Sequence, residues 1–172
     1  MIIVYTGNGK GKTTASLGQA VRSLGEGKKV IMIQFVKGPW RSGEDEFISK
    51  FKIPKNKFRV IKGGKGFVGI MGDRLPRSIH KKTARDTLKF AKKTILSKKY
   101  DLVILDEMNV AVGLKLISEN DVLKVLRKVP NSIDVILSGR NAPKKLVDLA
   151  DIATEMKEIK YKFRPSKQGI EY

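Results

Sequence analysis

The sequence of 172 residues contains no cysteine, and it has only one histidine and one tryptophan. Without cysteine the chain cannot form a disulfide or a cysteine-ligated zinc site, and a single histidine excludes a histidine-rich metal site. No cysteine can act as a nucleophile and no Ser-His-Asp set is evident, so a covalent intermediate on a protein side chain has little support. His80 falls in a basic helical segment, where we expect a surface histidine rather than a catalytic one.

Long apolar runs are also absent. No stretch approaches the roughly 20 apolar residues that cross a bilayer, and the N-terminus begins as a core strand rather than as a signal-type segment. We therefore expect a cytoplasmic protein with no membrane partner. The length predicts one domain, residues 1–172, with a core of ordinary size.

Acidic residues are few, because 17 Asp and Glu stand against 36 Lys and Arg, which gives a net charge of +19. Such an excess is typical of nucleic-acid binding, of attraction for polyanionic small molecules, or of a lysine-rich proteome. The lysines are scattered in pairs along the chain, whereas a nucleic-acid surface would gather them among aromatic residues. We therefore expect nucleic-acid binding to be non-specific only.

Strand-like and helical patterns alternate along the chain. Continuous apolar runs, typical of strands covered on both faces of a parallel sheet, occupy residues 2–5, 30–35, 58–61, 102–105 and 133–137. Helical patterns occupy residues 14–24, 77–96, 118–129 and 143–149, with a short helix at 44–51. This order predicts a doubly wound α/β fold with a mostly parallel sheet and helices on both faces. Residues 36–57 and 62–76 are predicted as long loops that help to build a ligand site at the carboxyl ends of the strands.

The most informative segment is residues 2–14, IIVYTGNGKGKTT. A β-forming run leads into a glycine-rich turn that opens a helix, which is the order of a phosphate-binding P-loop. Glycines let backbone N–H groups converge on phosphates at the helix N-terminus, Lys12 adds a charge, and Thr13 offers a hydroxyl ligand for Mg²⁺. The usual spacing places a glycine where Thr6 stands, so a Gly/Lys-rich surface turn is the alternative.

A second nucleotide signal is the apolar run 102–105 that ends in Asp106 and Glu107. Carboxylates at the carboxyl end of such a strand would lie where Mg²⁺ meets Thr13, and the alternative is an acidic strand end that caps the next helix. Arg140 follows the apolar run 133–137 and is predicted at the same sheet edge, where a guanidinium suits phosphate. An exposed surface arginine is the alternative there.

Four segments in the same order resemble the P-loop ATP:corrinoid adenosyltransferases, also called cob(I)alamin adenosyltransferases. They are the loop 7–14 (GNGKGKTT), residues 34–44 (QFVKGPWRSGE), residues 105–109 (LDEMN), and residues 138–140 (SGR) followed by 150–151, 154–156 and the closing 169–172. The resemblance spans nearly the whole chain, and its first two segments together are specific.

The resemblance implies a RecA-like P-loop fold and transfer of the adenosyl group of ATP to the Co(I) of a reduced corrinoid, with release of triphosphate. Cobalt would be the nucleophile, so the protein needs none. By position, the resemblance implies catalytic roles for Lys12, Thr13 and Glu107, and Mg²⁺ or Mn²⁺ ligands at Thr13, Asp106 and Glu107. It implies ATP contacts from Gly7, Asn8, Gly9, Lys10, Gly11, Lys12, Thr13, Thr14, Lys37 and Arg140, and a corrinoid contact from Phe67. It also implies a homodimer and a partner protein that supplies the reductant.

Two departures from the family pattern fall on the corrinoid side. Family members commonly carry G-x-G-F-T-W after the third strand, whereas residues 64–69 here read GKGFVG, with Phe67 retained and Gly69 at the tryptophan position. The tail between Phe163 and Gly169 is also shorter. The alternative function is therefore a related P-loop ATP-binding protein or ATPase that lacks corrinoid transfer and associates with nucleic acid. For Phe67 the alternative to a corrinoid contact is simple packing of the loop on the core, and Trp40 in segment 34–44 is ambiguous in the same way.

Overall fold

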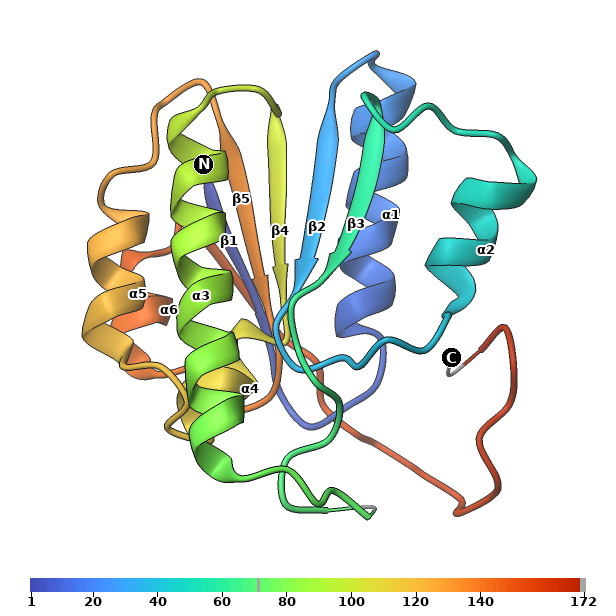
Figure 1. The fold of residues 1–172 in the computed structure, drawn as a ribbon. Helices are drawn as coiled ribbons and strands as arrows, with labels where there is room; N and C mark the ends of the chain where they lie inside the picture. Colours follow the sequence, from blue (N-terminus) through green and yellow to red (C-terminus); the bar gives the residue numbers. More distant parts are fainter. Residues whose placement is uncertain (71, 171–172) are drawn as a thin grey trace.

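In residues 1–70 and 72–170, which the computed structural model describes, six parallel strands form one sheet and helices cover both of its faces (Figure 1). Glu171 and Tyr172 of the predicted closing segment lie outside the described residues. In chain order the elements are β1 (Ile2–Thr6), α1 (Lys12–Gly25), β2 (Val30–Gln34), α2 (Gly43–Lys50), β3 (Phe58–Lys62), α3 (Arg77–Leu96), β4 (Leu102–Asp106), α4 (Met108–Gly113), α5 (Glu119–Leu126), β5 (Asp134–Ser138), α6 (Lys144–Leu149) and β6 (Ile152–Glu155).

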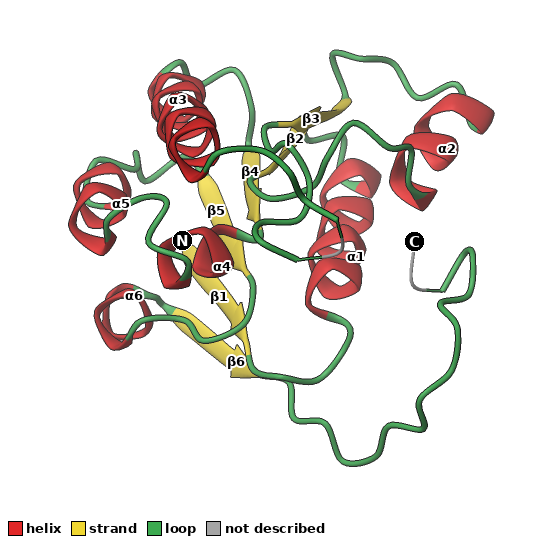
Figure 2. Cartoon of the chain, turned by 60° about the horizontal axis from the view of Figure 1, so that its bottom comes forward, coloured by secondary structure: helices red, strands yellow, loops and turns green. Residues whose placement is uncertain are grey.

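The strand order is β3-β2-β4-β5-β1-β6, and every neighbouring pair is parallel. This confirms the predicted α/β class. Because β1 lies between β5 and β6, the loop after it is flanked by the ends of both strands. The carboxyl ends of all the strands meet at one edge of the sheet, where their loops gather (Figure 2).

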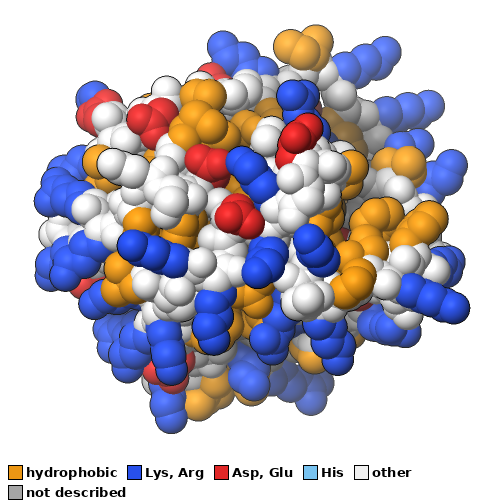
Figure 3. All heavy atoms as spheres, turned by 90° about the horizontal axis from the view of Figure 1, so that it is seen from above, with side chains coloured by type: hydrophobic (Ala, Val, Ile, Leu, Met, Phe, Trp, Pro, Cys, Tyr) orange, Lys and Arg blue, Asp and Glu red, His pale blue; other side chains and the backbone are white. Residues whose placement is uncertain are grey.

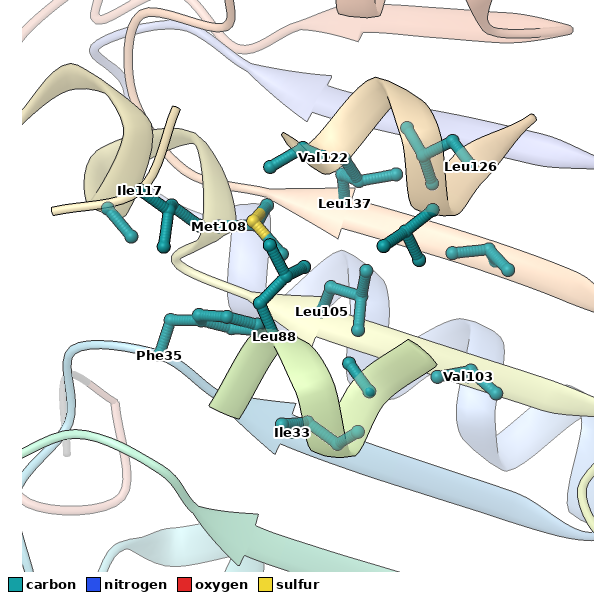
Figure 4. Packing of buried hydrophobic residues seen from close by; sticks show 14 of the residues in the cluster. Ile33, Phe35, Leu88, Val103, Leu105, Met108, Ile117, Val122, Leu126 and Leu137 are labelled. Atoms are coloured by element: carbon teal, nitrogen blue, oxygen red, sulfur yellow. The ribbon is translucent and has the colours of Figure 1, made fainter. Parts of the chain in front are cut away.

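Alternate strand residues build one core on each face of the sheet. Ile33 and Leu105 belong to the core beneath α3, α5 and α6, and Leu88 of α3 points toward Phe35 and Leu105 there (Figure 4). Met32 and Ile104 belong to the second core, which α1 covers with Ala20 and α2 with Ile48. Because β2 and β4 are buried on both faces, they read as continuous apolar runs, as predicted.

Two elements were not predicted. Helix α4 begins at Met108, directly after β4, and is only six residues long. Strand β6 is exposed along its whole length and carries no apolar run. The predicted helices 14–24 and 118–129 also differ at their ends, since α1 begins at Lys12 and α5 ends at Leu126. No helix within the described residues is long and apolar enough to cross a membrane.

Candidate functional site at the carboxyl edge of the sheet

The loop between β1 and α1 is closed by its own lysine. Gly11 adopts φ +104° and precedes the first residue of α1, Lys12. The Lys12 side chain is buried, and its Nζ donates to the carbonyl oxygens of Gly7 at 2.7 Å and Gly9 at 2.5 Å. Burial lowers the pKa of Lys12, while the nearby Glu107 raises it. The loop therefore holds an ammonium group at its centre, at the N-terminus of a helix, which is an arrangement suited to phosphate.

Strand β6 and the residues after it pack against the outer side of this loop. The Gly9 N–H donates to the Met156 carbonyl oxygen at 2.7 Å, and Lys10 Nζ lies 5.1 Å from the centre of the Tyr161 ring. A Cβ atom on Gly7, where φ is +96°, would lie 2.3 Å from the Met156 oxygen. Two of the loop glycines are thus required by the close approach of the tail, a role that the phosphate-binding motif does not predict.

Asp106 is the centre of a buried network at the end of β4. Its Oδ1 accepts hydrogen bonds from Thr13 Oγ1 at 2.9 Å and from Ser138 Oγ at 2.6 Å. Its Oδ2 accepts from Gln34 Nε2 at 3.2 Å. The network joins the ends of β2, β4 and β5 to the first turn of α1, and it brings Thr13 and Asp106 into direct contact.

Glu107 follows Asp106 in a left-handed conformation, with φ +58°, and its N–H donates to Ser138 Oγ at 3.1 Å. Burial, together with the neighbouring Asp106 carboxylate, raises the pKa of Glu107 to about 6. The positive charges of three nearby cations, Lys12, Lys37 and Arg140, act against this shift. The site therefore combines two carboxylates with three cations, as an anionic ligand with a divalent metal would require.

The raised pKa of Glu107 predicts that this carboxylate destabilises the ligand-free fold. The cost is absent below pH 4.5, grows between pH 4.5 and 6, and is complete above pH 6, because ionisation is harder in the folded state. Glu107→Gln should therefore raise the free energy of unfolding above pH 6 by about 2 kcal/mol, since one pKa unit is worth about 1.4 kcal/mol. Urea unfolding at pH 4 to 8, without metal or nucleotide, measures this.

The exposed carboxylate Glu26, at the end of α1, provides the matched control for that series. Glu26→Gln should leave the unfolding free energy within about 0.5 kcal/mol of the wild type at every pH. A Glu107→Gln protein that is less stable than the wild type at pH 7.5 would contradict the electrostatic account.

A partly buried ion pair supports the edge of the site on β2. Glu44, in the first turn of α2, accepts hydrogen bonds from Gln34 Nε2 at 2.7 Å and from Lys37 Nζ at 2.8 Å. Burial alone would raise the pKa of Glu44, but the hydrogen bond and charge of Lys37 hold it at about 2. Lys37 is thereby fixed beside the carboxylates rather than left to solvent.

On the β3 side of the edge, Phe67 lies in the loop between β3 and α3 and is 45% exposed. Gly69 has open space around its Cβ position but adopts φ +70°, and its N–H donates to Asp73 Oδ2 at 2.8 Å. A tryptophan at position 69 would be strained in this loop conformation, which is a physical reason for the glycine.

The expectation that His80 lies on the surface is wrong. His80 is 4% exposed, and its Nε2 lies 2.9 Å from Asp73 Oδ2. The Asp73 carboxylate also accepts hydrogen bonds from the backbone N–H groups of Gly69 and Leu75, and these bonds lower its pKa. Because the same carboxylate contacts His80, it joins this loop to the first turn of α3. The burial of His80 depends on Asp73, a loop residue outside the helix, so the periodicity of the helix could not predict it.

The structure brings most of the predicted site together. Lys12, Thr13, Lys37, Asp106, Glu107 and Arg140 converge on one place, while Phe67 lies on the loop after β3, with its ring beside that of Trp40. Reasoning from the sequence missed Ser138 and Met156 as parts of the site, and it gave Gln34 and Glu44 no role there. The only signal for Ser138 was its position directly before Gly139 and Arg140.

Comparison with known proteins places this site in context. A family described as "ATP:corrinoid adenosyltransferase BtuR/CobO/CobP" matches residues 1–172. The chain is 33% identical to a corrinoid adenosyltransferase of Escherichia coli K12, over 100% of this chain and 85% of the relative. It is 36% identical to one of a Sinorhizobium species, over 100% and 80%.

Solved structures of similar fold include a KaiC-like protein of Pyrococcus horikoshii, with a TM-score of 0.56, 14% identity, and coverage of 98% of this chain and 82% of that one. The flagellar accessory protein FlaH of Methanocaldococcus jannaschii has a TM-score of 0.57 at 13% identity, with coverage of 90% and 69%. At this identity the likeness concerns the fold alone, which is the RecA-like P-loop fold.

Proposed function

Because the chain belongs to the ATP:corrinoid adenosyltransferase family, we propose that it transfers the 5′-deoxyadenosyl group of ATP to the Co(I) of a corrinoid. The observation that carries this proposal is the convergence of Lys12, Lys37 and Arg140 around the carboxylate of Glu107 at the end of a P-loop. The site is rich in charge for holding a triphosphate, and no nucleophile was evident among the protein's own side chains.

In this reaction the cobalt atom of the substrate attacks the 5′ carbon of ATP, and the bond from that carbon to the triphosphate oxygen breaks. The electron pair of the broken bond leaves with the triphosphate. Lys12 and Arg140 would hold the triphosphate and stabilise its growing negative charge, and Lys37, the third cation near Glu107, would border it. Pre-oriented charges of this kind act mainly when charge develops in the transition state.

Mg²⁺ fits the residues present. Thr13 and the carboxylates of Asp106 and Glu107 would hold it, and when bound it would neutralise part of the triphosphate charge. Within the described residues no group of three or more His, Asp and Glu side chains forms a metal cage. Mg²⁺ commonly binds through one or two carboxylates and substrate phosphates instead. The buried Oε1 of Gln34, which has no hydrogen-bond partner, would suit a water of its hydration shell.

The test is a visible spectrum. Chemically reduced cob(I)alamin mixed with the protein and Mg-ATP should give a product with the spectrum of an alkylcobalamin, and light should destroy that product. Omission of ATP should give no such product. A protein that binds ATP but leaves cob(I)alamin unchanged would favour the alternative of an ATPase without corrinoid transfer.

Phe67, half exposed on its loop, would contact the corrinoid in this proposal. We also infer a cytoplasmic homodimer that receives reduced corrinoid through a partner reductant protein. Sedimentation velocity of the purified chain tests the dimer, which predicts a species of twice the 19.2 kDa chain mass.

The net charge of +19 gives a further prediction. Lysines and arginines are spread across the face of the molecule on which the strands begin, with acidic side chains among them (Figure 3). We expect nucleic acid to bind weakly and without sequence preference, and the affinity to fall at least tenfold between 50 and 200 mM salt. Electrophoretic shifts with unrelated DNA and RNA measure it, and a tight complex with one sequence at 200 mM salt would contradict the prediction.

A further inference from the structure

An exposed pair of aromatic rings stands at the same sheet edge as the phosphate site. Trp40, in the loop between β2 and α2, is 61% exposed, and Phe67 is 45% exposed. Their ring centres are 6.1 Å apart and their planes are inclined by 32°. Two large neighbouring rings that remain this exposed form an apolar surface that a ligand can cover.

The Trp40 ring is seated on glycines. A Cβ atom on Gly38 would lie 2.4 Å from Cζ3 of the indole, and one on Gly66 would lie 2.6 Å from Cη2. Gly66 adopts φ +105°, and its N–H donates to the Val36 carbonyl oxygen at 3.1 Å. One side of the indole is therefore packed against backbone from two loops, while the ring as a whole stays open to solvent.

The loop that carries Trp40 is anchored to the sheet. Lys62, at the end of β3, donates from Nζ to the Trp40 carbonyl oxygen at 3.1 Å and to Ser42 Oγ at 2.8 Å. The same ammonium group forms an ion pair with Asp45 at 2.7 Å. These three contacts of one lysine restrain the loop at Trp40 and in the residues after it, so the indole is held in place before any ligand arrives.

The same loop leads directly to the phosphate site. Lys37, three residues before Trp40, is one of the cations around Glu107. Gly64 of the Phe67 loop packs on the Val36 and Lys37 backbone, where a Cβ atom would lie 2.4 Å from the Val36 carbonyl carbon. The aromatic pair is thus joined on both of its loops to Lys37, one of the cations near Glu107.

We propose that Trp40, together with Phe67, forms the wall on which the corrin ring of the substrate packs. This inference rests on the proposed transfer reaction and adds a specificity-determining residue to it. The corrin ring is broad, flat and largely apolar at its centre, so it matches a pair of exposed rings better than a single phenylalanine would. Held against this wall, the substrate lies beside the end of the site where Lys37 borders the triphosphate.

Phe51, directly after α2, provides a matched control, because it is an exposed ring (70%) that pairs with Phe47 rather than with Trp40. Equilibrium dialysis against cobalamin, in the presence of ATP, measures corrinoid affinity for the wild type, Trp40→Ala, Trp40→Phe and Phe51→Ala. We expect the corrinoid dissociation constant to rise about tenfold in Trp40→Ala and by a smaller factor in Trp40→Phe. It should stay unchanged in Phe51→Ala, and ATP affinity should be unchanged in all variants.

A second measurement uses the unaltered protein, so it does not depend on the folding of a variant. Hydroxyl-radical oxidation of Trp40, the only tryptophan in the chain, is followed by mass spectrometry and compared with oxidation of Phe51. Cobalamin should protect Trp40 severalfold and leave Phe51 unaffected, whereas ATP alone should protect neither.

The outcomes separate the inference from the proposed function. Transfer to cob(I)alamin by a wild type whose Trp40 is unprotected, or equal corrinoid affinity in Trp40→Ala, would overturn the role of Trp40 and leave the reaction standing. Parallel loss of ATP and corrinoid affinity in Trp40→Ala would mark the ring as loop packing and also overturn it. A wild type that neither binds nor alkylates cobalamin would overturn both.

Discussion

Replacing Lys12 with alanine should lower kcat/KM for ATP roughly 10- to 100-fold, since one charge-assisted hydrogen bond contributes about 1.5–3 kcal/mol. The Lys12 ammonium group lies at the centre of the loop, bonded to the Gly7 and Gly9 carbonyl oxygens, and it is already desolvated by burial. When a phosphate binds, the ammonium group would give up these neutral carbonyl oxygens for a charged phosphate oxygen. Alanine leaves the N-terminus of α1 in place but removes the buried ammonium group from the loop, where the other lysine, Lys10, is exposed.

Lys57 is the matched control for this substitution. Its Nζ also donates to a glycine carbonyl oxygen, that of Gly27 at 3.0 Å, but at the opposite edge of the sheet, where the strands begin. Lys57→Ala should leave kcat/KM within twofold of the wild type. Equal kcat/KM for folded Lys12→Ala protein and the wild type at limiting ATP would show that the phosphate site is misplaced.

The second large effect concerns stability. Gly7→Ala should lower the free energy of unfolding by roughly 2–5 kcal/mol, since a positive φ costs a side chain about 1–2 kcal/mol and overpacking costs another 1–3. The new Cβ would stand 2.3 Å from the Met156 carbonyl oxygen and 2.8 Å from the Met156 nitrogen, which are both backbone atoms. Strand β6 would therefore have to move away from the loop. Urea unfolding followed by circular dichroism measures the loss.

Gly27→Ala isolates the clash from the backbone strain. Gly27 has φ +73° but no atom within 4 Å of its Cβ position, so only the strain of roughly 1–2 kcal/mol applies there. If Gly7→Ala were no more destabilising than Gly27→Ala, the tail would not pack on the phosphate loop as described. The unfolding free energies of the two variants are measured again with saturating ATP. A smaller stabilisation by ATP in Gly7→Ala than in Gly27→Ala would show that nucleotide binding depends on the position of β6.

The strands that can be predicted from the sequence are those buried on both faces. Residues of β2 and β4 face a core on either side, so their apolar runs are continuous and easily recognised. Strand β6 is an exposed edge strand of four residues, held by pairing with β1 rather than by apolar burial. Helix α4 is too short to show a period, and it follows Glu107, whose left-handed backbone is a tertiary feature.

The residues of the site also fall into two groups, those that a local sequence motif predicts and those that only tertiary contacts bring together. Lys12, Thr13, Asp106 and Glu107 belong to local motifs whose spacing carries the chemistry, so the sequence predicts them. Ser138 and Gln34 take part only because neighbouring strand ends bring them to the Asp106 carboxylate. Met156 contacts the phosphate loop through its backbone, and no side-chain pattern reports such a contact.

The identity of the leaving group tests the central claim most directly. The protein, reduced cobalamin and Mg-ATP are allowed to react, and the phosphorus-containing products are identified by ³¹P nuclear magnetic resonance. We predict intact triphosphate, formed in equal amount with the light-sensitive alkylcobalamin, because the bond at the 5′ carbon is the one that breaks. ADP and phosphate as the only products would contradict the account, because they would show that this site hydrolyses ATP and transfers no adenosyl group.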